Sequence, residues 1–299
     1  MSAPARLLRA GSRRVDFAGA PLLMGIVNAT PDSFSDAGEL PDVPARVARA
    51  HELAAAGARI IDVGAESAFG GRPPVPADEE AGRVVPVIER IAAELDVLVS
   101  VDTYKPAVAE AAIAAGAQIV NDVSGLCDPA LAELCAATGS GLVLMHTRVA
   151  PKGTLLEPDF YDDVVADVRD FLAERIALAE AAGMRREQLL LDPGPDFAKT
   201  PAQTVAVLRR LDSLHELGRP LLLAVSRKDF LGAITGRAPR ERGAATLAAV
   251  GWAADAGAHA VRVHDVRAAA DFLAVRAVLR GDRALGPVEG LTPDRYPPG

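Results

Sequence analysis

A short aliphatic run closed by a polar residue occurs eight times along the chain, usually after an alanine-rich stretch that ends in glycine. The pattern is clearest from Ala56 to Gly64 and from Ala115 to Asp122, and looser copies run over residues 138–146, 182–192 and 256–264. Glycine commonly ends a helix at its C′ position. An unbroken aliphatic run is typical of a parallel strand that is buried on both faces. The repeat therefore predicts a helix, a strand and then a loop that begins with a functional group.

The aliphatic segments predict eight parallel strands, at residues 21–28, 58–64, 97–102, 117–122, 141–145, 189–192, 220–225 and 258–263. Helical stretches separate them, and those before the fourth and fifth strands are short. Eight β/α units favour a closed (β/α)₈ TIM barrel over an open doubly wound sheet. No Gly-x-Gly-x-x-Gly follows the first strand, which counts against a dinucleotide-binding fold. We expect one domain over residues 20–280, with an N-terminal extension (1–19) and a flexible C-terminal tail (281–299).

Charge and hydropathy narrow the classes of partner. The formal net charge is −8 and there is no long basic run, so we expect no nucleic-acid partner. No apolar run approaches the roughly 20 residues that span a membrane, and no apolar segment follows the basic N-terminus as in a secretory signal. Cys127 and Cys135 are interpreted as small buried apolar residues rather than as a disulfide or metal site. Together these features predict a cytoplasmic enzyme.

The active site of a (β/α)₈ barrel lies at the carboxyl ends of its strands, so the residues there are the candidates. They are Asn28, Asp62, Glu66, Asp102, Asn121, Asp122, Met145, His146, Asp192, Ser226, Arg227, Lys228, Arg262 and His264. For Asp62 and Asp122 the capping of a helix N-terminus is an equal alternative. The other three histidines, His51, His215 and His259, are interpreted as surface or packing residues.

These candidates fall into two chemical groups. The acids and amides suit the edge of a flat heterocycle, because a carboxylate can accept from an amino group and an adjacent ring N–H together. Lys228, Arg262 and, in part, His264 supply positive charge that suits a phosphate or another oxyanion. Polar residues that only capped helices would not be expected to divide into these two chemical groups.

Ordered motifs at the strand ends resemble those of dihydropteroate synthases. The run Met24-Gly-Ile-Val-Asn28-Ala-Thr30-Pro-Asp32-Ser33-Phe34 is similar to the first signature of that family. The resemblance continues through Ile61-Asp62-Val-Gly64-Ala-Glu66-Ser67, Ser100-Val-Asp102-Thr103-Tyr-Lys105, Asn121-Asp122-Val-Ser-Gly125, Leu144-Met145-His146, Leu191-Asp192-Pro-Gly194, Ser226-Arg227-Lys228 and Arg262-Val-His264. Because the motifs occur in the family's order, the chain is identified as a member of that family.

The resemblance implies a reaction and its binding residues. The substrates would be 6-hydroxymethyl-7,8-dihydropterin pyrophosphate and p-aminobenzoate, and the products 7,8-dihydropteroate and pyrophosphate. The pterin would be held by Asp102, Asn121, Asp192 and Lys228, with Met145 lining its slot. Phe197 and Ser226, together with Lys228, would border the p-aminobenzoate site.

The resemblance also implies how the leaving group is held. Asn28 would help to carry Mg²⁺ on the pyrophosphate, and Arg262 and His264 would grip that group. The expected catalytic residues are therefore Asp102, Lys228, Arg262 and His264. The family's usual state implies a homodimer.

Two loops depart from the family pattern. After the second strand, the family's Gly-Gly-Glu-Ser-Thr-Arg-Pro-Gly is replaced by a run in which Ala68 and Phe69 stand for the Thr and Arg. In the family, that Thr and Arg close over the pyrophosphate and the arylamine. In this chain Arg72 is the nearest arginine that could take the place of the missing one. The family's Pro-Gly-Ile-Gly-Phe-Gly-Lys becomes Pro-Gly-Pro-Asp-Phe-Ala-Lys, so Asp196 adds a negative charge beside the arylamine carboxylate. Asp229 likewise replaces a small polar residue.

Alternative functions remain open on these residues. A pterin-binding paralogue that is inactive, or that uses another amine, would also show the changes at Ala68, Phe69 and Asp196. A methyltetrahydrofolate-dependent methyltransferase grips its pterin with a similar Asp, Asn and Asp set. A methyl donor has no pyrophosphate, however, so Arg262 and His264 count against that activity. A non-enzymatic barrel would not need cations that converge with acids and amides.

Overall fold

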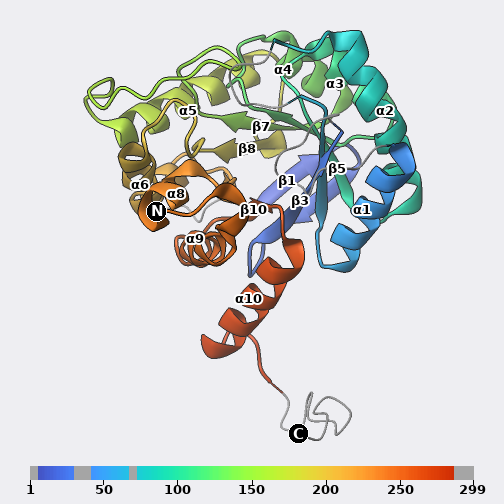
Figure 1. The fold of residues 1–299 in the computed structure, drawn as a ribbon. Helices are drawn as coiled ribbons and strands as arrows, with labels where there is room; N and C mark the ends of the chain where they lie inside the picture. Colours follow the sequence, from blue (N-terminus) through green and yellow to red (C-terminus); the bar gives the residue numbers. More distant parts are fainter. Residues whose placement is uncertain (1–5, 30–41, 67–72, 286–299) are drawn as a thin grey trace, which may run out of the picture.

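The computed structural model describes residues 6–29, 42–66 and 73–285, which form a parallel β-barrel surrounded by helices (Figure 1). The barrel strands are β3 (Leu22–Asn28), β4 (Ile60–Gly64), β5 (Leu98–Asp102), β6 (Ile119–Asp122), β7 (Gly141–Met145), β8 (Leu189–Asp192), β9 (Leu222–Leu223) and β10 (Ala260–Val263). They pair in parallel in the order β8-β7-β6-β5-β4-β3-β10-β9. A bridge between Leu191 and Leu221 joins the two ends of this sheet. The ring is thereby nearly closed, and the predicted (β/α)₈ barrel is confirmed.

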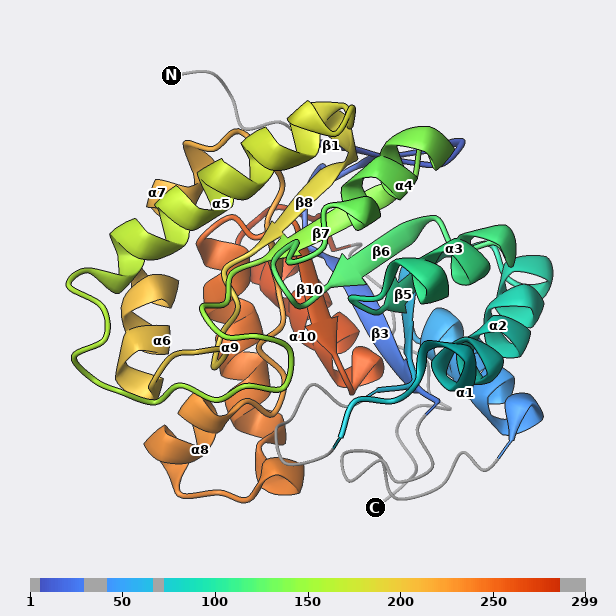
Figure 2. The same cartoon turned by 90° about the horizontal axis from the view of Figure 1, so that it is seen from above.

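The helices surround the strands on the outside, as the view from above shows (Figure 2). They are α1 (Val43–Ala55), α2 (Ala77–Glu94), α3 (Pro106–Ala114), α4 (Ala130–Thr138), α5 (Val164–Ala181), α6 (Pro201–Arg209), α7 (Asp212–His215), α8 (Asp229–Thr235), α9 (Gly243–Asp255) and α10 (Val266–Leu279), with 3₁₀ turns η1 (Arg186–Gln188) and η2 (Pro239–Glu241). The helices before the fourth and fifth barrel strands, α3 and α4, have nine residues each. The prediction that they are short is confirmed.

Glycine ends the helices where the repeated phrase places it. Gly57 after α1 and Gly116 after α3 have φ angles of +108° and +111°, which side chains with a Cβ rarely adopt. A Cβ at Gly116 would also lie 2.7 Å from the Cβ of Ala92. The sharp turn from helix to strand therefore requires glycine at this position.

An N-terminal hairpin covers the amino ends of the strands. Its strands are β1 (Leu7–Ala10) and β2 (Arg13–Asp16). Leu8 on β1, and Phe17 just after β2, pack on the apolar side chains inside the barrel. The guanidinium of Arg219, only 2% exposed, donates to Leu7 O at 2.8 Å and to Leu189 O at 3.2 Å. Because this end is filled, polar chemistry is left to the carboxyl ends of the strands.

Several further expectations are tested by the described residues. None of the helices in this part of the chain could cross a membrane. Both cysteines are free. Cys135 is buried as expected, but the prediction for Cys127 is wrong, because it is exposed in the turn before α4. Residues 286–299 of the expected tail lie outside the described residues.

Candidate active site

The expected pterin-binding residues lie together at the carboxyl ends of neighbouring strands. Asp102 on β5 is the register partner of Asn121 on β6, and Met145 on β7 is the partner of Asp192 on β8. Asn121, Met145 and Asp192 are all less than 5% exposed. One carboxylate, one amide and one thioether are thus buried at the barrel mouth, and the second carboxylate, Asp102, lies beside them with its side chain 16% exposed.

Arg262 on β10 reaches across this mouth to two carboxylates. Its Nε donates to Asp62 Oδ2 at 2.7 Å, and its Nη2 donates to Asp102 Oδ2 at 2.8 Å. Asp62 is fully buried, and it also accepts from Ser100 Oγ at 2.6 Å and from Asn121 Nδ2 at 3.1 Å. The residue expected to grip pyrophosphate is therefore tied, through Asp62, to a residue expected to hold the pterin.

The sequence did not single out Asp62 for this role. Its partners Ser100, Asn121 and Arg262 come from β5, β6 and β10, so the capping alternative is wrong for it. The available signal was its place in the middle of β4 rather than at the end, since an acid inside a buried strand needs a buried partner. Asp122, in contrast, accepts from the backbone N–H groups of Ser124 and Leu126 in the turn that follows β6. It does not cap a helix, because α4 begins only at Ala130 and has no side-chain cap.

Burial sets the ionisation of the groups in the mouth. It raises the pKa of Asp192 to about 6, and it raises the pKa of Asp102 against the opposing effect of Arg262. Burial also lowers the pKa of Lys228, an effect that the carboxylates of Asp196 and Asp192 partly offset. In such a poorly solvated site, a charge-assisted hydrogen bond to a ligand is stronger than it would be in water.

His264 lies beside Ser226, with 2.9 Å between its Nδ1 and the serine Oγ. Burial, together with the nearby Arg227 and Arg262, lowers the pKa of His264 to about 3. The imidazole is therefore neutral at pH 7, and the partial positive charge expected from the sequence is wrong. A neutral ring can still serve an oxyanion as an N–H donor.

Asn28 ends β3, the strand that pairs with β10, so it lies on the strand next to that of Arg262. Among the described residues, no group of three or more His, Cys, Asp or Glu could hold a metal ion. Mg²⁺ often takes only one or two protein oxygens, together with substrate phosphates and water. The donors present therefore fit Mg²⁺ carried on a pyrophosphate, rather than a metal held by protein alone.

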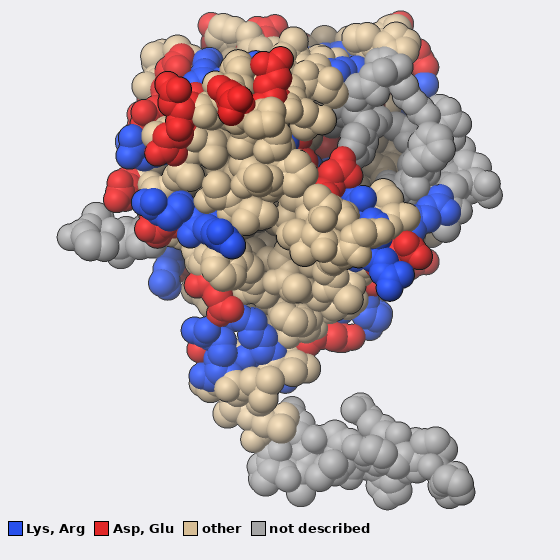
Figure 3. All heavy atoms as spheres, turned by 60° about the vertical axis from the view of Figure 1, so that its left-hand side comes forward, with Lys and Arg blue, Asp and Glu red and all other residues tan. Residues whose placement is uncertain are grey.

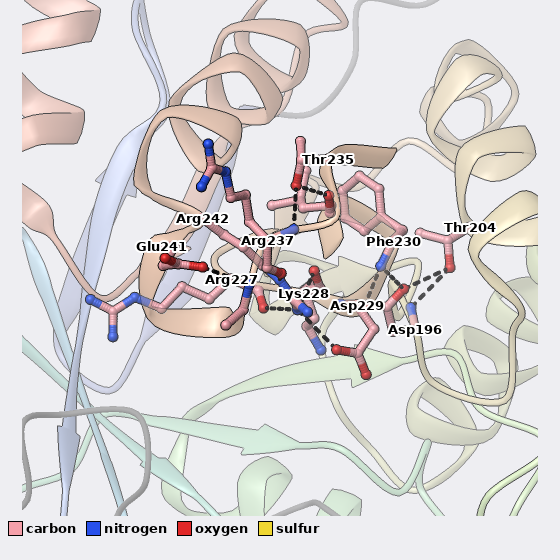
Figure 4. Close-up of polar contacts among 12 residues, drawn as sticks. Asp196, Thr204, Arg227, Lys228, Asp229, Phe230, Thr235, Arg237, Glu241 and Arg242 are labelled. Atoms are coloured by element: carbon pink, nitrogen blue, oxygen red, sulfur yellow. Dashed lines mark hydrogen bonds and ion pairs between the residues drawn. The ribbon is translucent and has the colours of Figure 1, made fainter. Parts of the chain in front are cut away.

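The loop after β8 approaches Lys228 (Figure 4). Gly194, Asp196 and Ala198 alternate along it with φ angles of 63°, 63° and 49°. For alanine this left-handed conformation costs about 1–2 kcal/mol. The Tyr161 hydroxyl donates to Ala198 O at 2.7 Å, and Thr204 Oγ accepts from Asp196 N at 3.0 Å. Side-chain hydrogen bonds therefore help to hold a loop whose backbone would favour glycine.

Asp196 joins this loop to the start of α8. Its carboxylate accepts from the backbone N–H groups of Asp229 and Phe230, in the first turn of that helix (Figure 4). The Lys228 Nζ lies 4.2 Å from the centroid of the Phe197 ring. The extra acid of the sequence is thus a structural link as well as a charge, and it adjoins the residues expected to border the arylamine.

Arg242 holds the same turn from the other side. Its Nη1 donates to Arg227 O at 2.9 Å, to Lys228 O at 3.0 Å and to Asp229 Oδ1 at 2.9 Å. Asp229, the second unusual acid, is therefore paired with a cation. No local motif marked Arg242, because its role depends on the packing of α8 against the start of α9.

A buried chain of polar groups supports the β8 loop from behind. Lys199 Nζ donates to Gly194 O and Phe197 O at 3.0 Å each, and it lies 2.7 Å from His146 Nδ1. The His146 Nε2 lies 2.8 Å from Asp167 Oδ1. Burial lowers the pKa of Lys199 to about 7 and that of His146 to about 4. His146 is therefore a neutral supporting residue rather than a charged ligand group.

Glu66 anchors the base of the loop after β4. It accepts from the Tyr104 hydroxyl at 2.9 Å and forms ion pairs with Lys105 and with Lys152, the latter at 2.8 Å. The altered positions Ala68, Phe69 and Arg72 lie outside the described residues. What was expected of them remains a prediction.

Comparison with known proteins gives consistent results. A profile of the family described as "Pterin binding enzyme" matches residues 24–264. The chain is 43% identical to the dihydropteroate synthase of Escherichia coli over 255 residues, which is 85% of this chain and 90% of that protein. It is 49% identical over 244 residues to a probable bifunctional folylpolyglutamate synthase/dihydropteroate synthase of Haloferax volcanii, covering 82% of this chain but only 29% of that longer protein.

A solved structure is also similar. The dihydropteroate synthase of Xanthomonas albilineans with 4-aminobenzoic acid superposes with a TM-score of 0.84 at 44% identity. The match covers 93% of this chain and 99% of that one. The similarity thus extends over the barrel and over every strand end described above.

Proposed function

Because the chain belongs to the dihydropteroate synthase family of pterin-binding enzymes, we propose that its barrel mouth divides into a pterin slot, a pyrophosphate site and an amine platform. The reaction joins 6-hydroxymethyl-7,8-dihydropterin pyrophosphate to p-aminobenzoate and releases pyrophosphate. The observation that carries this assignment is the pair of buried residues Asn121 and Asp192, with Asp102 beside them in contact with the guanidinium of Arg262. Acids and an amide that suit a heterocycle, and a cation that suits the leaving group, therefore lie together at the barrel mouth.

The pterin slot recognises ring N–H and amino groups. Asp192 and Asp102 accept these hydrogens, and Asn121 can both donate and accept. A carboxylate in contact with the pterin also stabilises positive charge that spreads from the methylene carbon into the ring as the leaving group departs. Met145 supplies an apolar wall.

The pyrophosphate site neutralises the leaving group. Arg262 offers a planar guanidinium for its oxygens, and neutral His264 offers an N–H. Asn28 would hold Mg²⁺ on the pyrophosphate, and the metal would supply further positive charge there. These groups favour cleavage of the bond between the methylene carbon and the pyrophosphate oxygen, with the electron pair leaving on that oxygen.

The amine platform is formed by Phe197 and Lys228, with Ser226 nearby. The Phe197 ring gives a flat surface for an aromatic amine, and Lys228 lies over that ring. The amine nitrogen then forms the new bond to the methylene carbon and loses a proton. No nucleophilic side chain is required, because the protein acts by orienting the reactants and by electrostatics.

Pyrophosphate release from the pterin pyrophosphate, with and without p-aminobenzoate, tests the assignment. A synthase should release it together with formation of 7,8-dihydropteroate. A paralogue with weak or no synthase activity, which Asp196 beside the platform favours, would bind the pterin pyrophosphate without that product. If the protein does not bind the pterin pyrophosphate at all, both functions are refuted.

We also propose a homodimer that uses the face of α9 and α10. Val275 and Leu279 are 59% and 83% exposed there, in an open groove that Phe272 also lines. Trp252 of α9 is 51% exposed. Figure 3 shows basic side chains gathered near the projecting end of the molecule, and on α10 both Arg276 and Arg280 pair with Asp255 of α9. An apolar patch flanked by both charges suits a self-complementary contact between two copies. Sedimentation of the wild type and of Leu279→Glu tests it: the variant should be monomeric.

A further inference from the structure

The turn at the start of α8 and the loop after β8 form one wall of the amine platform, and Asp196 connects them (Figure 4). Its carboxylate accepts from Asp229 N and Phe230 N, and Thr204 Oγ donates to its Oδ1 at 3.2 Å. Three donors therefore hold the carboxylate in one orientation. A charge fixed in this way acts on a ligand more strongly than one on a mobile surface side chain.

This fixed charge lies next to the residues that would contact the amine. Asp196 precedes Phe197 directly, and its partner Asp229 follows Lys228 directly. Lys228 belongs to this wall, and the negative charges of Asp196 and Asp192 raise its pKa against the larger effect of burial. Arg242, which holds the turn from the other side, is engaged by Asp229 and by two backbone carbonyls. Lys228 and Arg242 thus both interact with acids of the protein.

We propose that Asp196 is a specificity-determining residue of the amine platform, which disfavours aromatic amines that carry a carboxylate relative to neutral amines of the same shape. The proposal rests on the proposed function, since it takes the Phe197–Lys228 wall as the place of the amine. A second carboxylate brought to this wall meets the like charge of Asp196, and the nearby Lys228 and Arg242 already interact with acids of the protein. Two like charges about 5–7 Å apart near a protein surface repel enough to change affinity by roughly tenfold to a hundredfold.

The test compares p-aminobenzoate with 4-aminobenzamide, which has the same ring and a neutral amide in place of the carboxylate. Asp196→Asn keeps a residue that tolerates positive φ and can still cap α8, but it removes the charge. We expect the ratio of kcat/KM for p-aminobenzoate to that for 4-aminobenzamide to rise at least about tenfold in this variant, mainly through a lower KM for p-aminobenzoate.

Two control variants separate charge from structure. Thr204→Val removes one of the three donors to the carboxylate but keeps its charge, so it should lower kcat/KM for both amines and shift the ratio far less than Asp196→Asn does. Asp96→Asn removes an equal charge from an exposed position before β5, at the opposite end of the barrel, and should also leave the ratio unchanged.

Calorimetry makes the result independent of turnover. Each amine is titrated into enzyme saturated with the pterin pyrophosphate analogue or with pterin and pyrophosphate, and the ratio of the two dissociation constants is compared between wild type and Asp196→Asn. If product formation fails but this ratio shifts as expected, the synthase assignment is wrong and the specificity role stands. An unchanged ratio, an equal change for both amines, or no binding of either amine would overturn the role of Asp196.

Discussion

Arg262 and Asp102 form an ion pair across the barrel mouth, with 2.8 Å between the guanidinium Nη2 and the carboxylate Oδ2. Arg262 is proposed to bind the pyrophosphate and Asp102 the pterin. The two ends of one substrate therefore each bind one partner of this ion pair. A ligand that accepts from Arg262 frees Asp102 to accept from the pterin. The two subsites should therefore be coupled, and the pyrophosphate should strengthen pterin binding.

Asp62 should control this coupling through the position of Arg262. In Asp62→Asn the guanidinium loses one of its two carboxylate partners in a buried site, a loss worth about 2–4 kcal/mol. We expect kcat/KM for the pterin pyrophosphate to fall about thirtyfold to a thousandfold, with a smaller loss in affinity for the free pterin alcohol. Ser100→Ala, which removes only a neutral donor to the same carboxylate, should cost less than about tenfold. Equal effects of the two variants would contradict the role of Asp62.

Mg²⁺ should strengthen binding of the pterin pyrophosphate and have little effect on the pterin alcohol. The reason is that Asn28 alone is a poor metal site, so the ion needs oxygens of the pyrophosphate. In Arg262→Ala most of the affinity difference between the two ligands should disappear. Titration calorimetry with and without Mg²⁺ measures this. Metal-independent binding of both ligands to the wild type would show that the pyrophosphate site is assigned incorrectly.

Asp192→Asn should increase the stability of the protein at neutral pH while it weakens pterin binding. Folding raises the pKa of Asp192 from 3.8 to about 6, so the native state binds this proton more tightly than the unfolded state does. The stability it contributes is full below about pH 3.8 and is lost as the pH rises through about 6, a loss of about 3 kcal/mol. The variant lacks this loss, so its Tm relative to the wild type should increase between pH 4.5 and pH 7.5.

The same substitution should weaken pterin binding by about 2–4 kcal/mol at pH 7.5, because a charged partner in a buried site becomes neutral. In the wild type, pterin affinity should rise with pH through about 6, and this rise should be absent in the variant. Unchanged pterin affinity in Asp192→Asn would remove Asp192 from the slot.

Lys199→Met tests the support behind the β8 loop. It leaves three buried acceptors without their donor, so we expect pterin affinity to fall about tenfold. Folding lowers the pKa of Lys199 from 10.5 to about 7. This group's contribution to stability is therefore present above about pH 10.5 and lost as the pH falls through about 7. The Tm of the wild type relative to the variant should be higher at pH 9.5 than at pH 7.5. If the difference in Tm between the two proteins is the same at both pH values, folding does not lower the pKa of Lys199.

The loop after β4 gives a prediction that rests on the sequence alone. Ala68 and Phe69 replace a hydroxyl and a guanidinium that the family uses over the reacting centre, so turnover should suffer more than pterin binding. Ala68→Thr combined with Phe69→Arg should raise kcat. Arg72→Ala tests whether the nearby arginine has taken over the role of the missing one. The prediction is wrong if the wild type turns over as fast as an ordinary member of the family and Arg72→Ala does not change that rate.

Much of the fold could be predicted because it depends on local rules. Gly57 and Gly116 end helices in a conformation that other residues rarely adopt, and the short aliphatic run that follows each of them is a buried strand. Eight such units close into a barrel, which brings Asp102, Asn121 and Asp192 to one end without further information. These residues could therefore be named as a group from their positions along the chain.

What the sequence by itself determined is thus the barrel, the polar strand ends and the family. The tertiary structure decided which of these groups pair and which are charged. Asp62 meets Arg262 across 200 positions of the chain, and Asp196 reaches the first turn of α8 across 33. Burial beside Arg227 and Arg262 makes His264 neutral. Pairing and ionisation depend on distance and desolvation in three dimensions, and neither quantity is encoded in the spacing of residues along one strand.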